Sequence, residues 1–369
     1  MSLPAPFQTA APERGSAKPS AKRMPRVAFF VYPTAFQSPG GGEIQLLKTK
    51  EYLEKRGVEI QFFNPWNDKL EAFDILHTFG SVKDCLDMIK TAKVLGVKTV
   101  LSTICWYSWQ SAWGIYTQPD KRLQSMTHQF AKTFFPVWPS LRKSMMEVSD
   151  LLYPNSECEA RQLSRYFMMP KDKIFVVPNG VDPVFETASP DPFVHEYGLK
   201  NFILCVGRIE PRKNQLNMIR ALKNIKVPLV FIGDYVHQYR DYYIACRREA
   251  DSNVFFLQCM PHDSNLLASA YAACNTFLLA SWLETPGLAA LEAGLAGAKV
   301  VITSEGATRE YFANYATYVS PVGLKQIREM TLRAYESPRN NNLRDHIRRN
   351  YLWERAAEKT LEGYQRLLA

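Results

Sequence analysis

The chain has 369 residues, 46% of them hydrophobic and 22% charged, with a formal net charge of +9 at pH 7. This length and composition predict a globular protein with room for two domains. Its seven cysteines, an odd number without a Cys-x-x-Cys pair, argue against a disulfide-stabilised fold and for a reducing compartment. The positive charge favours an anionic partner but does not choose among nucleic acid, acidic lipid and a nucleotide diphosphate.

Neither the N-terminus nor the longest uncharged stretch predicts a membrane anchor. Residues 1–23 are rich in Pro, Ala, Ser and basic residues without periodicity, which predicts a disordered basic tail without the apolar core of a signal peptide. Leu266 to Leu283 is uncharged and about as long as a membrane span, but Asn275 and Thr276 divide it into a helix and a buried strand. We therefore expect a cytoplasmic protein.

Strands and helices alternate along the rest of the chain. In the first half we predict strands at 26–31, 58–63, 74–78 and 98–102 and helices at 43–55, 82–95 and 156–166. In the second half we predict strands near 202–206, 228–232, 254–257, 276–280 and 299–302. This alternation predicts an α/β fold, with two Rossmann-like, doubly wound domains at 24–185 and 186–350 that face each other across a cleft. A final helix covers 351–369.

Three glycines, Gly40, Gly41 and Gly42, lie between the first strand and the first helix. Bare backbone at such a turn can approach a phosphate closely. The loop is not the dinucleotide fingerprint, because the third glycine is missing from its place and no acidic residue follows at the required distance. The alternative is a flexible turn.

A second phosphate-binding turn is predicted after the buried strand 201–206. Gly207 ends this strand, and Arg208, Arg212 and Lys213 lead into a helix that we expect to continue to about residue 223. Arg212 and Lys213 are predicted in the first helical turn, where cations oppose the helix dipole. Three cations there favour a bound anion, with a solvated basic turn as the alternative.

Two carboxylates, Glu284 and Glu292, flank an otherwise apolar segment. Thr285 is a good N-cap and Pro286 suits the first helical position, so we predict a helix from there to about residue 298. Glu292 would then lie roughly 9 Å along the axis from Glu284. The N–H groups of the first turn would meet a diphosphate, leaving one carboxylate for the sugar and the other for the ribose. The alternative is a buried helix with a salt-bridged Glu292.

Taken together, these motifs resemble those of the family-4 retaining glycosyltransferases of the GT-B fold. Residues 207–214 look like the family's diphosphate-binding turn, and residues 284–292 look like its Glu-x7-Glu element. Residues 39–45, 176–182 and 353–364 are similar to its first Gly-rich loop, its domain junction and its closing helix. The resemblance covers about residues 25 to 369.

The resemblance implies transfer of a sugar from a nucleotide-diphosphate sugar to an acceptor hydroxyl, with retention at the anomeric carbon. The N-terminal domain would bind the acceptor and the C-terminal domain the donor, with the final helix packed back on the first domain. Fixed cations would stabilise the leaving phosphate in place of a metal ion, so no metal or other cofactor is expected. Arg208, Lys213 and Glu284 are the implied catalytic residues. The implied donor-binding residues are Gly41, Gly42, Gly207, Arg208, Lys213, Met260, Glu284, Pro286, Gly287, Leu288 and Glu292.

One feature departs from the family. Relatives commonly carry a histidine after the fourth strand, whereas residues 101–106 here contain none, and His77 follows the preceding strand, where a structural role is at least as good an interpretation. Two other functions stay open. A GT-B nucleotide-sugar epimerase would lack the Arg208/Lys213 and Glu284/Glu292 pairs, and a nucleic-acid-binding protein would carry a Lys/Arg-dense helix, which is not evident.

Residues 104–145 combine aromatic and cationic side chains. The mixture suits docking on an anionic membrane, where rings lie among the headgroups, and it equally suits a sugar-stacking acceptor groove or an ordinary core helix. On the membrane interpretation the acceptor is a lipid-linked glycan, as in bacterial polysaccharide or glycolipid assembly, and the enzyme is peripheral. The residues concerned are Trp106, Tyr107, Trp109, Trp113, Tyr116, Phe130, Phe134, Phe135 and Trp138, with Lys121, Arg122, Lys132, Arg142 and Lys143.

Overall fold

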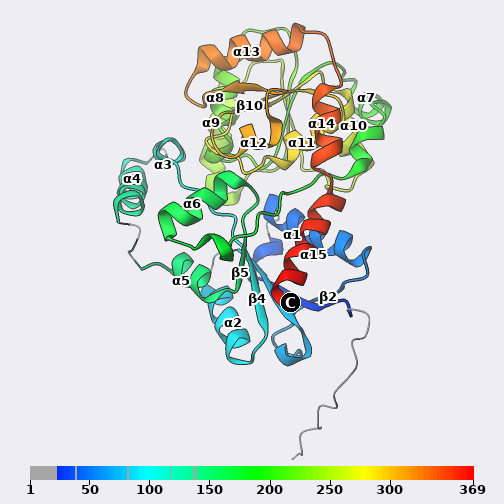
Figure 1. Ribbon diagram of the computed structural model, residues 1–369. Helices are drawn as coiled ribbons and strands as arrows, with labels where there is room; N and C mark the ends of the chain where they lie inside the picture. Colours follow the sequence, from blue (N-terminus) through cyan, green and yellow to red (C-terminus); the bar gives the residue numbers. More distant parts are fainter. Residues whose placement is uncertain (1–22, 38–39, 81–82, 117, 136, 138) are drawn as a thin grey trace, which may run out of the picture.

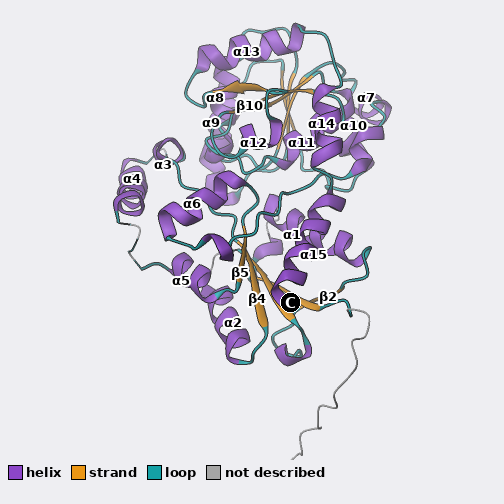
Figure 2. Cartoon of the chain, viewed as in Figure 1, coloured by secondary structure: helices purple, strands orange, loops and turns teal. Residues whose placement is uncertain are grey.

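The structure, a computed structural model, describes residues 23–369 apart from 38–39, 81–82, 117, 136 and 138. It contains two parallel β-sheets, each enclosed by helices (Figures 1 and 2). The predicted α/β fold class with two doubly wound parallel sheets is therefore confirmed. The expected disordered tail falls, but for residue 23, outside the described residues.

The first sheet has the strand order β2-β1-β3-β4-β5, with all neighbours parallel. Side chains that alternate along β1 enter two separate cores, Val27 and Phe29 on one face and Ala28 and Phe30 on the other. Both faces are thus covered, as parallel sheets require. The strands are β1 (Arg26–Val31), β2 (Glu59–Phe62), β3 (Ile75–Phe79), β4 (Lys98–Ser102) and β5 (Leu151–Tyr153). The α-helices of this part are α1 (Gly41–Glu54), α2 (Lys83–Val94), α3 (Trp109–Gly114), α4 (Pro119–Phe134), α5 (Leu141–Val148) and α6 (Glu157–Phe167).

The second sheet has the order β11-β10-β9-β6-β7-β8, again with all neighbours parallel. Its strands are β6 (Ile203–Val206), β7 (Leu229–Ile232), β8 (Val254–Leu257), β9 (Thr276–Leu279), β10 (Lys299–Thr303) and β11 (Thr317–Val319). Its α-helices are α7 (Asp191–Tyr197), α8 (Gln215–Ala221), α9 (Arg240–Glu249), α10 (Asn265–Ala273), α11 (Leu288–Leu295), α12 (Thr308–Phe312), α13 (Leu324–Glu336) and α14 (Asn342–Asn350). The short strands β5 and β11 were not predicted from the sequence.

The last helix, α15 (Trp353–Leu368), returns to the first sheet and lies beside α1 (Figure 1). Trp353 and Tyr364 are buried in the same core as Val27 and Phe29. The chain crosses between the domains twice at one place, where Val181 N donates to Tyr351 O at 2.8 Å. Among the helices that the structure describes, none is long and apolar enough to span a membrane.

The aromatic and basic stretch does not form one surface. Trp106 packs against the core of the C-terminal domain, and Tyr107 is buried, so both are wrongly included in a membrane-facing set. Trp138 lies outside the described residues. Lys132 is only 4% exposed and is not a surface cation. The exposed part is carried by α3, α4 and the residues that follow α4.

Candidate active site

The two predicted donor-site segments meet at the centre of the second sheet. β6 and β9 are parallel neighbours, so the loops that follow their carboxyl ends lie side by side, at the point where the strand order reverses. Lys213 Nζ donates to Glu284 Oε1 at 2.7 Å, and Arg212 Nη1 is 3.8 Å from the same oxygen. The sequence motifs separated by about seventy residues therefore form one cluster.

The turn after β6 differs from the predicted one. Arg212 and Lys213 belong to a short 3-10 turn, Pro211–Lys213, and α8 begins only at Gln215. Asn214 separates the two with a left-handed backbone (φ 62°), and its side-chain amide donates to Ala280 O at 2.8 Å and Pro321 O at 2.9 Å. The prediction that both cations occupy the first turn of this helix is wrong, because they lie just before its N-cap, Asn214.

Glu284 is 5% exposed and ionised in its paired state. Burial alone would raise the pKa of its carboxyl, but the charges of Lys213 and Arg212 outweigh burial and hold the pKa below its ordinary value. Its backbone is fixed by the segment after β10, since a Cβ on Gly306 would lie 1.9 Å from Glu284 O. Gly306 is a positioning residue, and no local pattern in the sequence singles it out.

Helix α11 begins later than predicted. Thr285–Pro286 is a cis peptide and Gly287 has φ 90°, a conformation that glycine adopts readily and that is not helical, so the helix starts at Leu288. The prediction of Thr285 as N-cap is wrong. The first turn of α11 nevertheless faces the other domain, because a Cβ on Gly41 would lie 3.7 Å from Leu288 Cδ1.

The Gly-rich loop of the first domain approaches the basic turn of the second. A Cβ on Gly40 would lie 3.5 Å from Arg208 Cζ and 3.6 Å from Glu43 Oε2. Glu43 Oε2 accepts from Gly40 N at 2.7 Å, and its Oε1 accepts from Tyr32 OH at 3.1 Å. Glu43 and Tyr32 therefore shape the loop beside Arg208, and neither was a predicted site residue.

Glu292 lies inside α11 and is 5% exposed. Its Oε1 is 2.8 Å from His262 Nε2, and its Oε2 accepts from Tyr271 OH at 2.7 Å. Burial alone would lower the pKa of His262, but the hydrogen bond and charge of Glu292 raise it above its ordinary value. Met260, 9% exposed, lies two residues before His262. The structure thus adds His262 and Tyr271 to the predicted residues.

The loop after β4 faces Gly42 and carries a strained residue. Ile104 has φ 40°, which is unusual for a β-branched residue, and its Cδ1 would lie 3.7 Å from a Cβ on Gly42. The residues on either side are held by buried Glu159, whose Oε1 accepts from Thr103 Oγ1 and Cys105 N, both at 2.6 Å. Burial raises the pKa of Glu159 to about 7.

His77 takes no part in this site. It is 1% exposed, and its ring nitrogens contact Tyr364 OH at 2.6 Å and Ser102 Oγ at 2.9 Å. Burial lowers its pKa to about 3, so the imidazole is neutral. The structural interpretation of His77 is the one that these contacts support.

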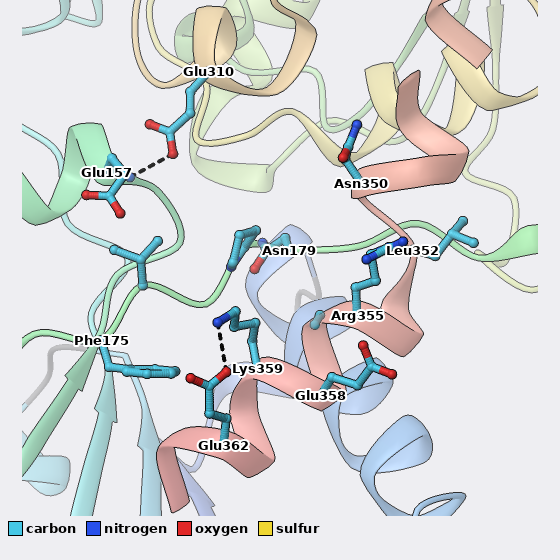
Figure 3. A pocket seen from close by; sticks show the side chains of 13 residues that line it. Glu157, Phe175, Asn179, Glu310, Asn350, Leu352, Arg355, Glu358, Lys359 and Glu362 are labelled. Carbon is cyan, nitrogen blue, oxygen red and sulfur yellow. Dashed lines mark hydrogen bonds and ion pairs between the residues drawn. The ribbon is translucent and has the colours of Figure 1, made fainter. Parts of the chain in front are cut away.

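A hollow of about 560 Å³ lies elsewhere, where the chain crosses between the domains (Figure 3). Its walls include Asn179, Asn350 and Arg355 but neither Lys213 nor Glu284. Beside it the Glu310 carboxylate of α12 accepts from the backbone N–H groups of Glu157 at 2.7 Å and Cys158 at 3.0 Å. Glu310 thus caps the N-terminus of α6 from the other domain, and the hollow is separate from the donor cluster.

Two facing α/β domains with a cation–carboxylate cluster at the switch point define the chain as a protein of the GT-B class. Two family models match it: "Glycosyltransferase Family 4" over residues 66–185 and "Glycosyl transferases group 1" over residues 191–351. The chain belongs to the family-4 glycosyltransferases of the GT-B fold.

The curated relatives that match the chain all have the same protein name. The D-inositol 3-phosphate glycosyltransferase of Xylanimonas cellulosilytica is 26% identical over 346 residues, which cover 78% of this chain and 82% of that protein. The protein of the same name from Stackebrandtia nassauensis is 30% identical over 176 residues, 43% of this chain and only 39% of that protein.

Solved structures share the fold at low identity. Sucrose-phosphate synthase from Thermosynechococcus elongatus has a TM-score of 0.72 and 16% identity, over 94% of this chain and 99% of that one. Anabaena HepE in complex with UDP-glucose has a TM-score of 0.66 and 16% identity, over 93% of this chain and 100% of that one.

Proposed function

We propose that this glycosyltransferase moves a sugar, a hexose or a related unit, from a nucleotide-diphosphate sugar to an acceptor hydroxyl with retention at the anomeric carbon. The observation that carries the proposal is the buried Lys213–Glu284 pair beside Arg212, next to the first turn of α11. Cations held in place at the carboxyl ends of β6 and β9 suit a diphosphate that gains negative charge as its bond to the sugar breaks. The complex of Anabaena HepE with UDP-glucose supports a uridine diphosphate donor.

In this proposal each residue has a definite role. Arg208 and Lys213 stabilise the leaving diphosphate together with the N–H groups at the start of α11, so transfer does not require a metal ion. Glu284 binds hydroxyls of the donor sugar. Glu292, oriented by His262 and Tyr271, binds the ribose. Gly41, Gly42 and Gly207 let the backbone approach the donor closely.

The acceptor in this proposal is a glycan or a lipid-linked glycan of bacterial polysaccharide or glycolipid assembly, reached by docking on an anionic membrane. An α4 patch supports it, consisting of Trp113, Leu123, Phe130, Phe134 and Phe135, which are 53%, 66%, 51%, 60% and 51% exposed. Exposed apolar groups on and beside one helix, with the Phe130 and Phe134 ring centroids 4.6 Å apart, favour a membrane or partner surface over free solvent. The names of the curated relatives make a phosphorylated polyol the other acceptor class to test.

Two cations, one exposed and one half-buried, lie next to the α4 patch. Lys121 is exposed, and the Arg122 guanidinium stacks 4.6 Å from the Trp113 ring centroid. The double variant Lys121→Glu/Arg122→Glu should lose flotation with anionic vesicles, while charge reversal of Lys325, exposed on α13 of the other domain, should not. Equal flotation of both variants, or no flotation of the wild type, would leave a soluble enzyme with a soluble acceptor.

The donor assignment is tested with a panel of nucleotide sugars, read by released nucleoside diphosphate and by the shift in melting temperature. One nucleotide sugar should both stabilise the protein and be consumed when acceptor is present. Stabilisation by oligonucleotide alone, or interconversion of the donor without transfer, would refute the proposal in favour of nucleic-acid binding or epimerisation.

A further inference from the structure

Helix α4 exposes several apolar side chains and buries two polar ones. Its apolar residues Leu123, Phe130 and Phe134 point outward, while Gln129 and Lys132 face the protein at 3% and 4% exposure. A surface helix of a globular domain normally buries its apolar face. Figure 1 shows α4 on the outer side of the first domain, with α5 below it. The buried polar face of α4 therefore needs a reason of its own.

Lys132 is a buried cation without a carboxylate. Its Nζ donates to Ser140 Oγ at 2.9 Å and lies 4.9 Å from the Phe167 ring centroid. No carboxylate of the described residues lies within ion-pair distance of it. An ammonium group has three donors, and burying it without a counter-charge is unfavourable. One hydroxyl and one ring leave this side chain short of negative charge.

Two exposed nitrogen groups, those of Arg142 and His128, contact Tyr107, whose ring centroid lies 5.7 Å from that of Phe167, the ring beside Lys132. Arg142 of α5 donates to Tyr107 OH at 3.2 Å, and the His128 ring lies edge-on to Tyr107 with centroids 5.8 Å apart. Burial and the charges of Lys143 and Arg142 lower the pKa of Lys132, and burial with Lys132 and Arg142 lowers the pKa of His128. The charges of these groups therefore interact with one another. Glu147, the acidic residue of α5, is half exposed and lies 3.9 Å from Lys143.

We infer that Lys132, Arg142 and His128 form a binding site for the phosphate group of a phosphate ester between α4 and α5. Phosphate supplies the missing charge and enough oxygens for the ammonium, the guanidinium and the Tyr107 hydroxyl together. The adjacent α4 patch makes a lipid phosphate one source, and a soluble phosphomonoester is the other. The site goes beyond the proposed transfer reaction, because binding here involves neither the donor cluster nor turnover.

The test compares melting temperatures of the full chain at constant ionic strength, with and without inorganic phosphate or glycerol 3-phosphate. Lys132→Met keeps the aliphatic stem and removes the charge, and Lys121→Met is the matched control from the exposed side of the same helix. Without phosphate, Lys132→Met should melt at or above the wild-type temperature. Tens of millimolar ligand should raise the melting temperature of wild type and Lys121→Met by several degrees and leave Lys132→Met unchanged.

A second arm identifies the source. Flotation with phosphatidylcholine vesicles, with and without phosphatidic acid, is measured for wild type, Lys132→Met and the control Lys325→Met, whose exposed lysine lies on α13 of the other domain. A response to phosphatidic acid alone that depends on Lys132 assigns a lipid headgroup, and a response to glycerol 3-phosphate assigns a soluble ligand. If Lys132→Met folds, the site is refuted when this variant melts below the wild type without phosphate or when neither arm depends on Lys132.

Two controls keep this result separate from the donor proposal and from misfolding. UDP should stabilise Lys132→Met as it does the wild type, so a failure here would not be a failure of the donor site. If Lys132→Met does not fold, Arg142→Gln replaces it, because this residue lies at the edge of the site. Phosphate stabilisation of Arg142→Gln equal to that of wild type would then overturn the inference.

Discussion

Replacing Lys213 with methionine should both abolish transfer and destabilise the donor domain. The Lys213 and Glu284 side chains are 14% and 6% exposed, and their charged atoms are 2.7 Å apart. Methionine fills a similar volume but leaves the Glu284 carboxylate buried with only Arg212, at 3.8 Å, as a counter-charge. The buried pair thus predicts destabilisation, whereas a helix dipole alone would predict no change or a slight gain.

The size of the effect follows from burial. Removing one partner of a buried ion pair costs about 3–5 kcal/mol, and because Arg212 remains we expect about 3 kcal/mol. In a domain of this size that corresponds to a fall in melting temperature of roughly 6–12 °C. The pKa of Glu284 lies below its ordinary value of 4.5 in the native protein, so the pair stabilises above that pH. The difference in melting temperature between wild type and variant should narrow as the pH falls through and below the native pKa of Glu284, because Glu284 then takes up a proton.

Calorimetry on four proteins checks this reasoning. The double variant Lys213→Met/Glu284→Gln should recover most of the lost stability without recovering activity, because neither side chain then leaves a buried charge. Arg208→Ala is the control for catalysis alone. Its side chain is 40% exposed and 3.8 Å from Glu210, so its ion pair contributes about 0–1 kcal/mol to stability. Loss of its phosphate contact, about 1.5–3 kcal/mol, should slow transfer about ten- to hundredfold. Wild-type stability of Lys213→Met at pH 7 would refute the account.

Three further predictions concern other parts of the site. Transfer should survive EDTA, and full loss restored by Mg²⁺ or Mn²⁺ would contradict the proposed role of the fixed cations. Gly306→Ala should reduce turnover strongly, because its Cβ would displace the Glu284 backbone, and unchanged kinetics would show that this contact relaxes freely. The native pKa of His262 is raised, so its pair with Glu292 stabilises below the ordinary histidine value of 6.5 and is lost as the pH rises through the native pKa. Urea unfolding of His262→Gln should lack that pH dependence, and an unchanged profile would assign it to another group.

The sequence by itself determined the order and type of most elements. Alternating apolar runs and helix signals placed strands such as β4 (Lys98–Ser102) and β8 (Val254–Leu257) at their observed positions. It also selected Arg208, Lys213, Glu284 and Glu292, because charges set beside buried strands and apolar helices stand out locally. Such signals need only neighbouring residues to be recognised.

Tertiary structure alone decided where these elements begin and which side chains meet. Asn214, whose side chain donates to Pro321 O, and Gly287, beside which a Cβ would meet Ile302, have left-handed backbones, so α8 and α11 start later than local rules predict. His262 and Tyr271, the partners of Glu292, lie 30 and 21 residues from it in the sequence. The inward direction of Lys132 depends on Phe167, which lies on another helix. Contacts between residues so far apart are set by strand order and helix packing, which no local pattern encodes.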